Sequence, residues 1–136
     1  MTEQIKIFNL TQLFDDRGNL TFIESNEHIP FAIKRAHWIY DVPGGEFRGS
    51  HAYKKSQEFI IALSGSFDVI LHDGKTEKKY SLNRSYYGLY VPHMVWRSMD
   101  NFSTNALALV LSSEQYDETD YIRDFKMFSR LALKTI

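Results

Sequence analysis

Between residue 4 and about residue 112, the sequence consists of short runs rich in β-branched and aromatic residues, separated by brief turn segments. Many short strands at this spacing favour a β-sandwich or barrel. The Asp73-Gly74 pair between two of these runs is a strong signal for a hairpin turn. The sequence predicts strands at residues 5–9, 20–24, 32–40, 58–63, 67–72, 78–82, 88–91, 95–99 and 106–111. We therefore expect an all-β fold.

The last segment has a different period. Its apolar residues recur at every third position, as on one face of a helix. Asp117 or Thr119 can cap the start of that helix. The apolar face consists of Ile122, Phe125, Phe128 and Leu131. The pattern predicts a helix from residue 117 to about residue 134 that packs across the β-structure.

Composition excludes several classes of function. The 136 residues suit one domain, residues 1–136, and a hydrophobic content of 43% opposes disorder. A net charge of -1 argues against a nucleic-acid partner. The absence of cysteine excludes disulfides and zinc-thiolate sites. No signal peptide or membrane span is evident, so we expect a soluble, cytoplasmic protein without a membrane partner.

The segment from Gly45 to Gly65 is the most informative about chemistry. It resembles the first signature motif of cupins: Gly, five residues, His-x-His, four residues, Glu, six residues, Gly. Every spacing fits, but Tyr53 stands where the second histidine belongs. Residues 51 and 53 of one strand point to the same face. We therefore expect His51 and Tyr53 to face the mouth of a barrel.

The run that follows Pro92 resembles the second cupin motif, Pro-x-Gly-x-x-His, with Arg97 in place of the final histidine. A cupin metal requires about three histidines and a carboxylate. The resemblance leaves His51 and Glu58, and it adds a guanidinium that is always protonated. We therefore expect no catalytic metal and no cofactor.

The remaining residues suit acid–base chemistry. His51 has an unperturbed pKa of about 6.5 and can take and return a proton. Tyr53 can donate to a developing oxyanion. Arg35, Arg48 and Arg97 can stabilise an enediolate or hold phosphates. Moving a ketone to the adjacent carbon requires removal of a proton next to the carbonyl, stabilisation of the enediolate and return of a proton to the neighbouring carbon.

Several segments together resemble the nucleotide-sugar 3,4-ketoisomerases, which are small cupins: residues 29–35, 48–52, 88–96 and, most specifically, 116–123. Membership would imply a jelly-roll β-sandwich with a C-terminal helix, and a homodimer that often exchanges N-terminal strands. It would also imply conversion of thymidine-diphospho-4-keto-6-deoxyglucose to its 3-keto isomer. The family divides by the configuration at C4 of the product, and the basic residues Arg17 and Arg97 slightly favour the galacto product here. That product would supply amino-sugar synthesis for surface polysaccharides or glycosylated metabolites.

The resemblance also assigns roles by position. His51 matches the catalytic base, Arg35 and Arg48 match residues near the diphosphate and sugar, and Arg17 matches a position near the sugar. The family usually has tyrosine where this chain has His37. We hypothesise that His37 and Tyr53 exchange places across one hydrogen-bonded strand pair, which would preserve the imidazole and the phenol.

Three further residues are weaker candidates for substrate binding. His93 can contact substrate at the rim, Lys54 can reach a phosphate, and Glu58 can orient His51. Three other functions stay open: a nucleotide-sugar 3,5-epimerase, a non-catalytic cupin that binds a sugar nucleotide, and a metal-dependent cupin enzyme.

Overall fold

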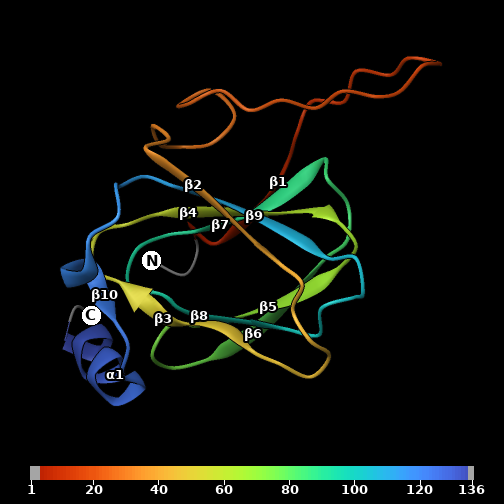
Figure 1. Cartoon of the computed structure of the whole chain (residues 1–136). Helices are drawn as coiled ribbons and strands as arrows, with labels where there is room; N and C mark the ends of the chain where they lie inside the picture. The colour runs from red at the N-terminus through yellow and green to blue at the C-terminus, as the bar shows by residue number, and fades with distance from the viewer. Residues whose placement is uncertain (1–3, 135–136) are drawn as a thin grey trace.

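The computed structural model describes residues 4–134, so the two ends of the expected 1–136 domain lie outside the described residues. Two five-stranded antiparallel sheets lie face to face (Figure 1). The first sheet has the order β1-β7-β4-β9-β2, and the second has the order β10-β3-β8-β5-β6. The strands are β1 (Lys6–Asn9), β2 (Arg35–Tyr40), β3 (Arg48–Tyr53), β4 (Glu58–Ser64), β5 (Phe67–His72), β6 (Glu77–Leu82), β7 (Tyr87–Val91), β8 (Trp96–Asp100), β9 (Leu107–Ser112) and β10 (Tyr121–Ile122). This arrangement confirms the expected β-sandwich.

The main core lies between the two sheets. Inward-facing side chains of both sheets, including Ile60, Val69, Leu89, Met99 and Val110, are fully buried there. Full burial of a Leu- or Val-sized side chain contributes about 1.5–3 kcal/mol. This core fixes which face of each strand points inward, because a shift of register by one residue would turn the strand's apolar side chains toward solvent.

A second apolar cluster covers part of the outer face of the first sheet. Ile29 and Phe31 from the N-terminal segment pack there against Phe59, Ile61 and Leu111. Strand β4 is therefore covered on both faces, which explains why its first five residues are all buried. A strand covered on both faces shows a continuous hydrophobic run rather than an alternating one.

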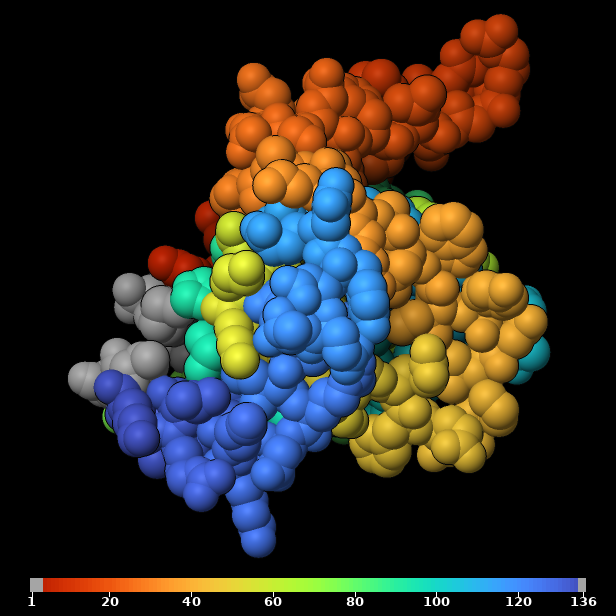
Figure 2. Space-filling model, turned by 60° about the vertical axis from the view of Figure 1, so that its left-hand side comes forward, coloured from red at the N-terminus to blue at the C-terminus, as the bar shows by residue number. Residues whose placement is uncertain are grey.

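The N-terminal region differs from the prediction of a strand at residues 20–24. The structure forms an isolated bridge between Leu13 and Leu20 instead. Their backbone groups exchange two hydrogen bonds of 2.9 Å around a turn at Asp15–Gly18, where the Gly18 amide donates to the Asp15 carbonyl. Residues 13–20, here called the arm, form the part of this segment that projects away from the sandwich (Figures 1 and 2). The prediction of a strand at residues 20–24 is therefore wrong, because only Leu20 of this segment pairs with another part of the chain.

The C-terminal region contains less helix than expected. Asp117 caps only a short 3-10 turn, Glu118–Asp120, and β10 follows it. The helix α1 (Phe125–Lys134) begins after Asp124, whose carboxylate accepts from the Lys126 amide at 3.1 Å. Pairing of β10 with β3 interrupts the predicted helix, because a strand partner captures the backbone of residues 121–122. Among residues 4–134, no helix is long and apolar enough to cross a lipid bilayer.

Candidate active site

Strand β3 carries the two residues at the centre of the cupin motif. The segment 48–53 is absent from the list of predicted strands, although the cupin motif treats residues 51 and 53 as one strand, and the structure pairs this segment with β8 and with β10. Tyr121 on β10 lies directly opposite Tyr53. Ring centroids are 4.8 Å apart between His51 and Tyr53, 5.0 Å between His51 and Tyr121, and 4.8 Å between Tyr53 and Tyr121. The imidazole and two phenols therefore form one aromatic cluster at the end of the sandwich that carries β10 and α1 (Figure 1).

A buried ion pair lies at this end of the interior. Arg97 is opposite His51 on the neighbouring strand β8. Its Nε donates to Glu58 Oε1 at 2.8 Å and its Nη2 donates to Oε2 at 2.9 Å, and both side chains are almost completely buried. Glu58 was expected to orient His51, but in the structure its partner is Arg97. Both ions are desolvated, so removing one of them would leave an uncompensated buried charge.

The donor set does not suit a divalent metal. Both oxygens of Glu58 accept from a guanidinium that stays protonated at all accessible pH values. A dication beside Arg97 would meet a like charge instead of a lone pair. Among the described residues, no three His, Asp or Glu side chains gather as ligands.

A bulge in β3 makes room for the guanidinium. The pairing of β3 with β8 shifts register between Arg48 and His51. Gly49 lies in this bulge with a φ of +66°, and Arg97 Nη1 donates to its carbonyl at 3.4 Å. A Cβ at Gly49 would lie 2.2 Å from Arg97 Nη1. Glycine is therefore required for both the backbone conformation and the space.

Both histidines of the site are held neutral. Burial, followed by the charge of Arg97, lowers the pKa of His51 to about 2. Burial also lowers the pKa of His37, against the opposing effect of the Glu58 carboxylate. His51 Nε2 and His37 Nδ1 are buried without a hydrogen-bond partner. A neutral imidazole nitrogen without a partner is free to accept a proton or to bind a substrate hydroxyl.

Tyr53 has the opposite character. Burial, followed by the charge of Glu58, raises its pKa well above the usual range for a phenol. The hydroxyl group therefore stays protonated and can act as a hydrogen-bond donor or an acid. The cluster combines a neutral base with a protonated acid whose ring lies 4.8 Å away. Proton transfer next to a carbonyl group needs a base that starts unprotonated and an acid that starts protonated, and the cluster holds one group in each of these forms.

The proposed exchange between His37 and Tyr53 is wrong in its detail. Strand β2, which carries His37, pairs with β9 in the first sheet, whereas β3 belongs to the second sheet. The two residues therefore do not share a hydrogen-bonded strand pair. His37 instead acts electrostatically on His51 from the opposite sheet. A cupin barrel brings residues of the two sheets together across the sandwich, and such contacts cannot be predicted from the sequence pattern of each strand alone.

Of the remaining predicted residues, some lie near the aromatic cluster or are exposed at the surface, and one lies on the arm. Arg35 lies near the cluster, with its guanidinium 5.2 Å from the centre of the Tyr116 ring. His93 Nδ1 lies 3.1 Å from the Lys54 carbonyl at the rim, and Arg48 and Lys54 are exposed. The structure does not place Arg17 with the other predicted site residues. Its side chain is 90% exposed at the tip of the arm, where it pairs with Asp15 at 3.0 Å.

The sequence reading missed two residues that shape the site, Tyr121 and Asp120. The buried Asp120 carboxylate accepts from the backbone amides of Lys55 and Ser56 at 2.7 and 3.1 Å, and from the Ser56 hydroxyl at 2.5 Å. It therefore anchors the C-terminal segment to the loop after β3. The string at 116–123 was recognised as the most specific part of the sequence, but the helix assigned to it concealed the direction of its side chains.

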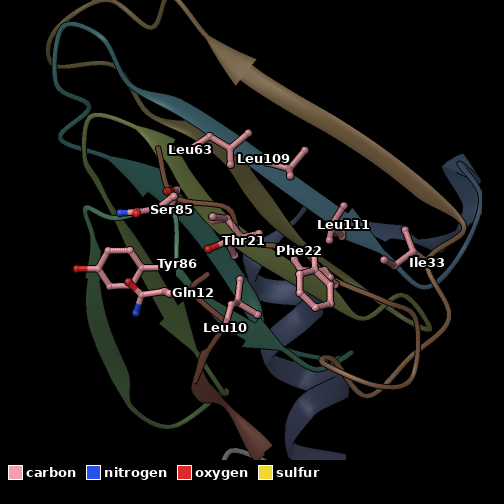
Figure 3. A pocket seen from close by; sticks show the side chains of 13 residues that line it. Leu10, Gln12, Thr21, Phe22, Ile33, Leu63, Ser85, Tyr86, Leu109 and Leu111 are labelled. Atoms are coloured by element: carbon pink, nitrogen blue, oxygen red, sulfur yellow. The ribbon is translucent and has the colours of Figure 1, made fainter. Parts of the chain in front are cut away.

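A cavity lies on the outer face of the first sheet, away from His51. It has a volume of about 590 Å³ and lies between the sheet and the N-terminal segment. Figure 3 shows Leu63, Leu109 and Leu111 from the sheet, with Phe22 and Thr21 from the N-terminal segment, lining this space. Its lining is mostly apolar, and Tyr86 is its only titratable side chain among the described residues. The cavity therefore suits packing rather than catalysis.

Fold and site together define a small cupin with an acid–base centre. The family model "FdtA: WxcM-like, C-terminal" matches residues 3–133, and the chain belongs to this family. It is 43% identical over 129 residues to the TDP-4-oxo-6-deoxy-α-D-glucose-3,4-oxoisomerase of Aneurinibacillus thermoaerophilus, covering 95% of this chain and 93% of that protein.

Solved structures give the same classification. A 3,4-ketoisomerase from Helicobacter canadensis is 41% identical, with a TM-score of 0.93 over 96% of this chain and 98% of that one. The 3,4-ketoisomerase QdtA from Thermoanaerobacterium thermosaccharolyticum is 38% identical. A histidine-to-asparagine mutant of QdtA, solved in complex with TDP-4-keto-6-deoxyglucose, has a TM-score of 0.95 over 98% of this chain and 97% of that one.

Proposed function

We propose that the protein is an isomerase that moves the keto group of TDP-4-keto-6-deoxyglucose from C4 to C3. The observation that carries this proposal is the buried, neutral His51 in contact with the protonated Tyr53. Membership of the family supports the choice of substrate, because its relatives are ketoisomerases of TDP-linked sugars. The reaction needs a base, an acid and an environment that favours an enediolate.

The proposed reaction proceeds in two proton-transfer steps. His51 takes the proton from C3 while Tyr53 gives its proton to the C4 oxygen, and an enediol forms. Tyr53 then takes the proton from the C3 oxygen as the C3 carbonyl forms. The protonated His51 then gives a proton to C4, which returns its imidazole to the neutral form. The sugar loses one C–H bond at C3 and gains one at C4, so atoms and electrons balance.

The surrounding cations take binding roles in this proposal. Arg35 and Arg48 hold the diphosphate, and Lys54 and His93 contact the substrate at the rim. Arginine suits this task because its planar fork matches phosphate oxygens. Arg97 supplies a fixed positive charge near the enediolate, through its position opposite His51 and its pairing with Glu58.

We also propose that the protein is a homodimer in which the arms cross to the partner subunit. Large apolar side chains of the arm are exposed, with Leu13 at 52%, Phe14 at 75% and Leu20 at 55%. The outer face of the first sheet exposes Trp38 at 58% and Leu63 at 44%. Exposed apolar surface of this extent is typical of an interface. Exchange of the arms would also bring Arg17 to the site of the partner.

The test of the catalytic proposal uses chelator-treated protein and TDP-4-keto-6-deoxyglucose in deuterated water, followed by NMR. We expect the 3-keto isomer with solvent deuterium at C4, and a galacto configuration at that carbon. His51→Asn should lower the rate by at least about 10²-fold, the lower range for loss of a general base. Tight binding of the nucleotide without exchange or product would instead identify a non-catalytic sugar-nucleotide-binding protein.

A further inference from the structure

Ser112, the last residue of β9, carries a buried hydroxyl group that forms no hydrogen bond. The residue is 1% exposed. A buried polar group without a partner costs free energy, so its presence in a folded protein requires an explanation. The adjacent Ser113 shows the usual case, because its hydroxyl accepts from the Gln57 amide at 2.8 Å. No contact within the fold explains why a serine stands at position 112.

The strand register places this hydroxyl at the proposed site. Ser112 lies directly opposite Arg35 on one neighbouring strand and directly opposite Glu58 on the other. Directly opposed residues point to the same face of a sheet, and Glu58 points inward to its buried partner Arg97. Ser112 therefore points into the interior from the first sheet, at the end where Arg97 and His51 belong to the second sheet.

His37 adds a second unpartnered group to the same wall. It lies opposite Val110, two residues before Ser112, so His37 and Ser112 are diagonal neighbours on one face. Such neighbours lie about 7–8 Å apart, which leaves room for one oxygen atom between their side chains. Among the described residues, four buried side-chain atoms lack a partner, and three of them belong to His37, His51 and Ser112. Unsatisfied polar groups gathered at one end of a sandwich indicate a site for a polar ligand.

We infer that Ser112 and His37 bind the C2 hydroxyl group of the sugar. This inference rests on the proposed ketoisomerase activity. In a 4-keto-6-deoxyhexose joined to a diphosphate at C1, the oxygens at C3 and C4 lose or gain a proton during the proposed reaction, and C6 carries no oxygen. The C2 hydroxyl is therefore the one free hydroxyl group that keeps its proton. The Ser112 O–H donates to the C2 oxygen, and His37 Nδ1 accepts the C2 hydroxyl proton.

The order of the residues matches the order of the carbons. C2 lies between C1, which carries the diphosphate, and C3, from which His51 takes a proton in the proposed reaction. Ser112 lies opposite Arg35, which is assigned to the diphosphate, and it points inward at the end that holds His51. A contact to the C2 hydroxyl would therefore fix which ring carbon meets the base.

The test measures binding of two sugar nucleotides that cannot isomerise. TDP-6-deoxyglucose has a hydroxyl group at C4 in place of the keto group, and its 2-deoxy counterpart also lacks the C2 hydroxyl. By calorimetry, the unmodified protein should bind the first ligand about 10-fold or more tightly than the second, because the second leaves buried polar groups unpaired. Ser112→Ala should weaken binding of the first ligand by about 5-fold or more and of the second by less than about twofold.

Ser98→Ala is the matched control. Ser98 lies on β8 between the buried Arg97 and Met99, so its side chain points to the outside of the second sheet. This change should leave the affinities for both ligands within about twofold of those of the unmodified protein. A loss of affinity confined to Ser112→Ala and to the ligand with a C2 hydroxyl would support the inference.

Urea denaturation separates binding from a structural role. Because the Ser112 hydroxyl has no partner, Ser112→Ala should keep or raise the denaturation midpoint. Ser113→Ala loses the hydrogen bond from the Gln57 amide and should lower the midpoint. A lower midpoint for Ser112→Ala, or loss of folding, would show that this hydroxyl serves the fold and would overturn the inference.

The binding results separate the inference from the proposed activity. Equal affinity of the unmodified protein for the two ligands would overturn the inference, as would equal weakening of both by Ser112→Ala. Either result leaves the proposed activity intact, because that activity is measured by formation of the 3-keto isomer. Absence of the isomer with the unmodified protein would instead contradict the proposed function.

Discussion

At the scale of single residues, the proposed site holds two ionisable groups in their neutral forms. His51 is deprived of water and lies beside the permanent cation of Arg97, so the imidazolium form is unfavourable. Tyr53 is deprived of water near the carboxylate of Glu58, so the phenolate is unfavourable. One buried ion pair therefore acts on the two groups in opposite directions. Its cation favours a neutral base, and its anion favours a neutral acid.

The low pKa of His51 predicts a pH-dependent stability. In the unfolded chain the pKa is about 6.5, whereas burial and then Arg97 lower it to about 2 in the folded protein. Below about pH 6.5 the unfolded state therefore binds a proton that the folded state does not. The stabilisation is fully present above that pH. It is lost at up to about 1.4 kcal/mol per pH unit as the pH falls toward 2.

Urea denaturation of the unmodified protein and of His51→Asn at about pH 7.5 and about pH 5 measures this effect. Between these two values, the unmodified protein should lose about 2 kcal/mol more free energy of unfolding than the variant. His37, whose pKa is also lowered by burial, adds a loss of the same sign to both proteins. Equal losses in the two proteins would show that His51 titrates normally in the folded state.

At the scale of structural elements, the bulge in β3 determines the geometry of the site. It lets the chain pass over Arg97 and then return to the register that places His51 opposite it. On this bulged backbone, a Cβ at residue 49 would overlap the guanidinium. Gly49 is therefore part of the architecture of the site although it has no chemical group of its own.

Gly49→Ala should lower the free energy of unfolding by about 2–4 kcal/mol, the range for strain combined with overpacking. The new Cβ would lie 2.2 Å from Arg97 Nη1, in a left-handed backbone conformation. Gly44→Ala is the matched control, because a Cβ there would meet nothing within 4 Å. Its effect should stay within about 0.5 kcal/mol. Equal denaturation midpoints for the two variants would contradict the role assigned to the bulge.

At the scale of the whole molecule, the arm is the feature that a single subunit does not explain. It stands clear of the sandwich with its apolar residues in solvent (Figure 2). The proposed dimer gives these residues a partner and gives Arg17 a site. The dimer therefore predicts effects on both assembly and activity.

Phe14→Asp should convert the dimer to a monomer, measured by analytical ultracentrifugation. A carboxylate in an apolar interface is left without a partner and costs several kcal/mol. Asp16→Ala, on the same exposed turn, should leave the dimer intact. Sedimentation of the unmodified protein at the mass of one chain would contradict the proposed dimer.

A mixing experiment tests the exchange of arms. Arg17→Ala and His51→Asn should each be nearly inactive alone. In a mixed dimer with exchanged arms, one site combines the unmodified Arg17 and His51, so refolding a 1:1 mixture should restore about a quarter of full activity. No recovery in a mixture shown to contain mixed dimers would mean that Arg17 does not serve the partner's site.

The sequence by itself determined the class of fold and the centre of the site. Alternating short runs, the Asp73-Gly74 turn and the spacing of the cupin motif depend on local chain geometry. They predicted the sandwich and the shared face of His51 and Tyr53. Local patterns carry such information because side-chain direction within a strand has a fixed period.

Only the tertiary structure decided which residues contact one another at the proposed site. It paired Glu58 with Arg97, set His37 in the opposite sheet and placed Tyr121 against Tyr53 through β10. Glu58 and Arg97 are 39 residues apart along the sequence, and Tyr53 and Tyr121 are 68 residues apart. No local period encodes contacts over such separations. They arise when two sheets fold against each other and a C-terminal strand completes the edge of one of them.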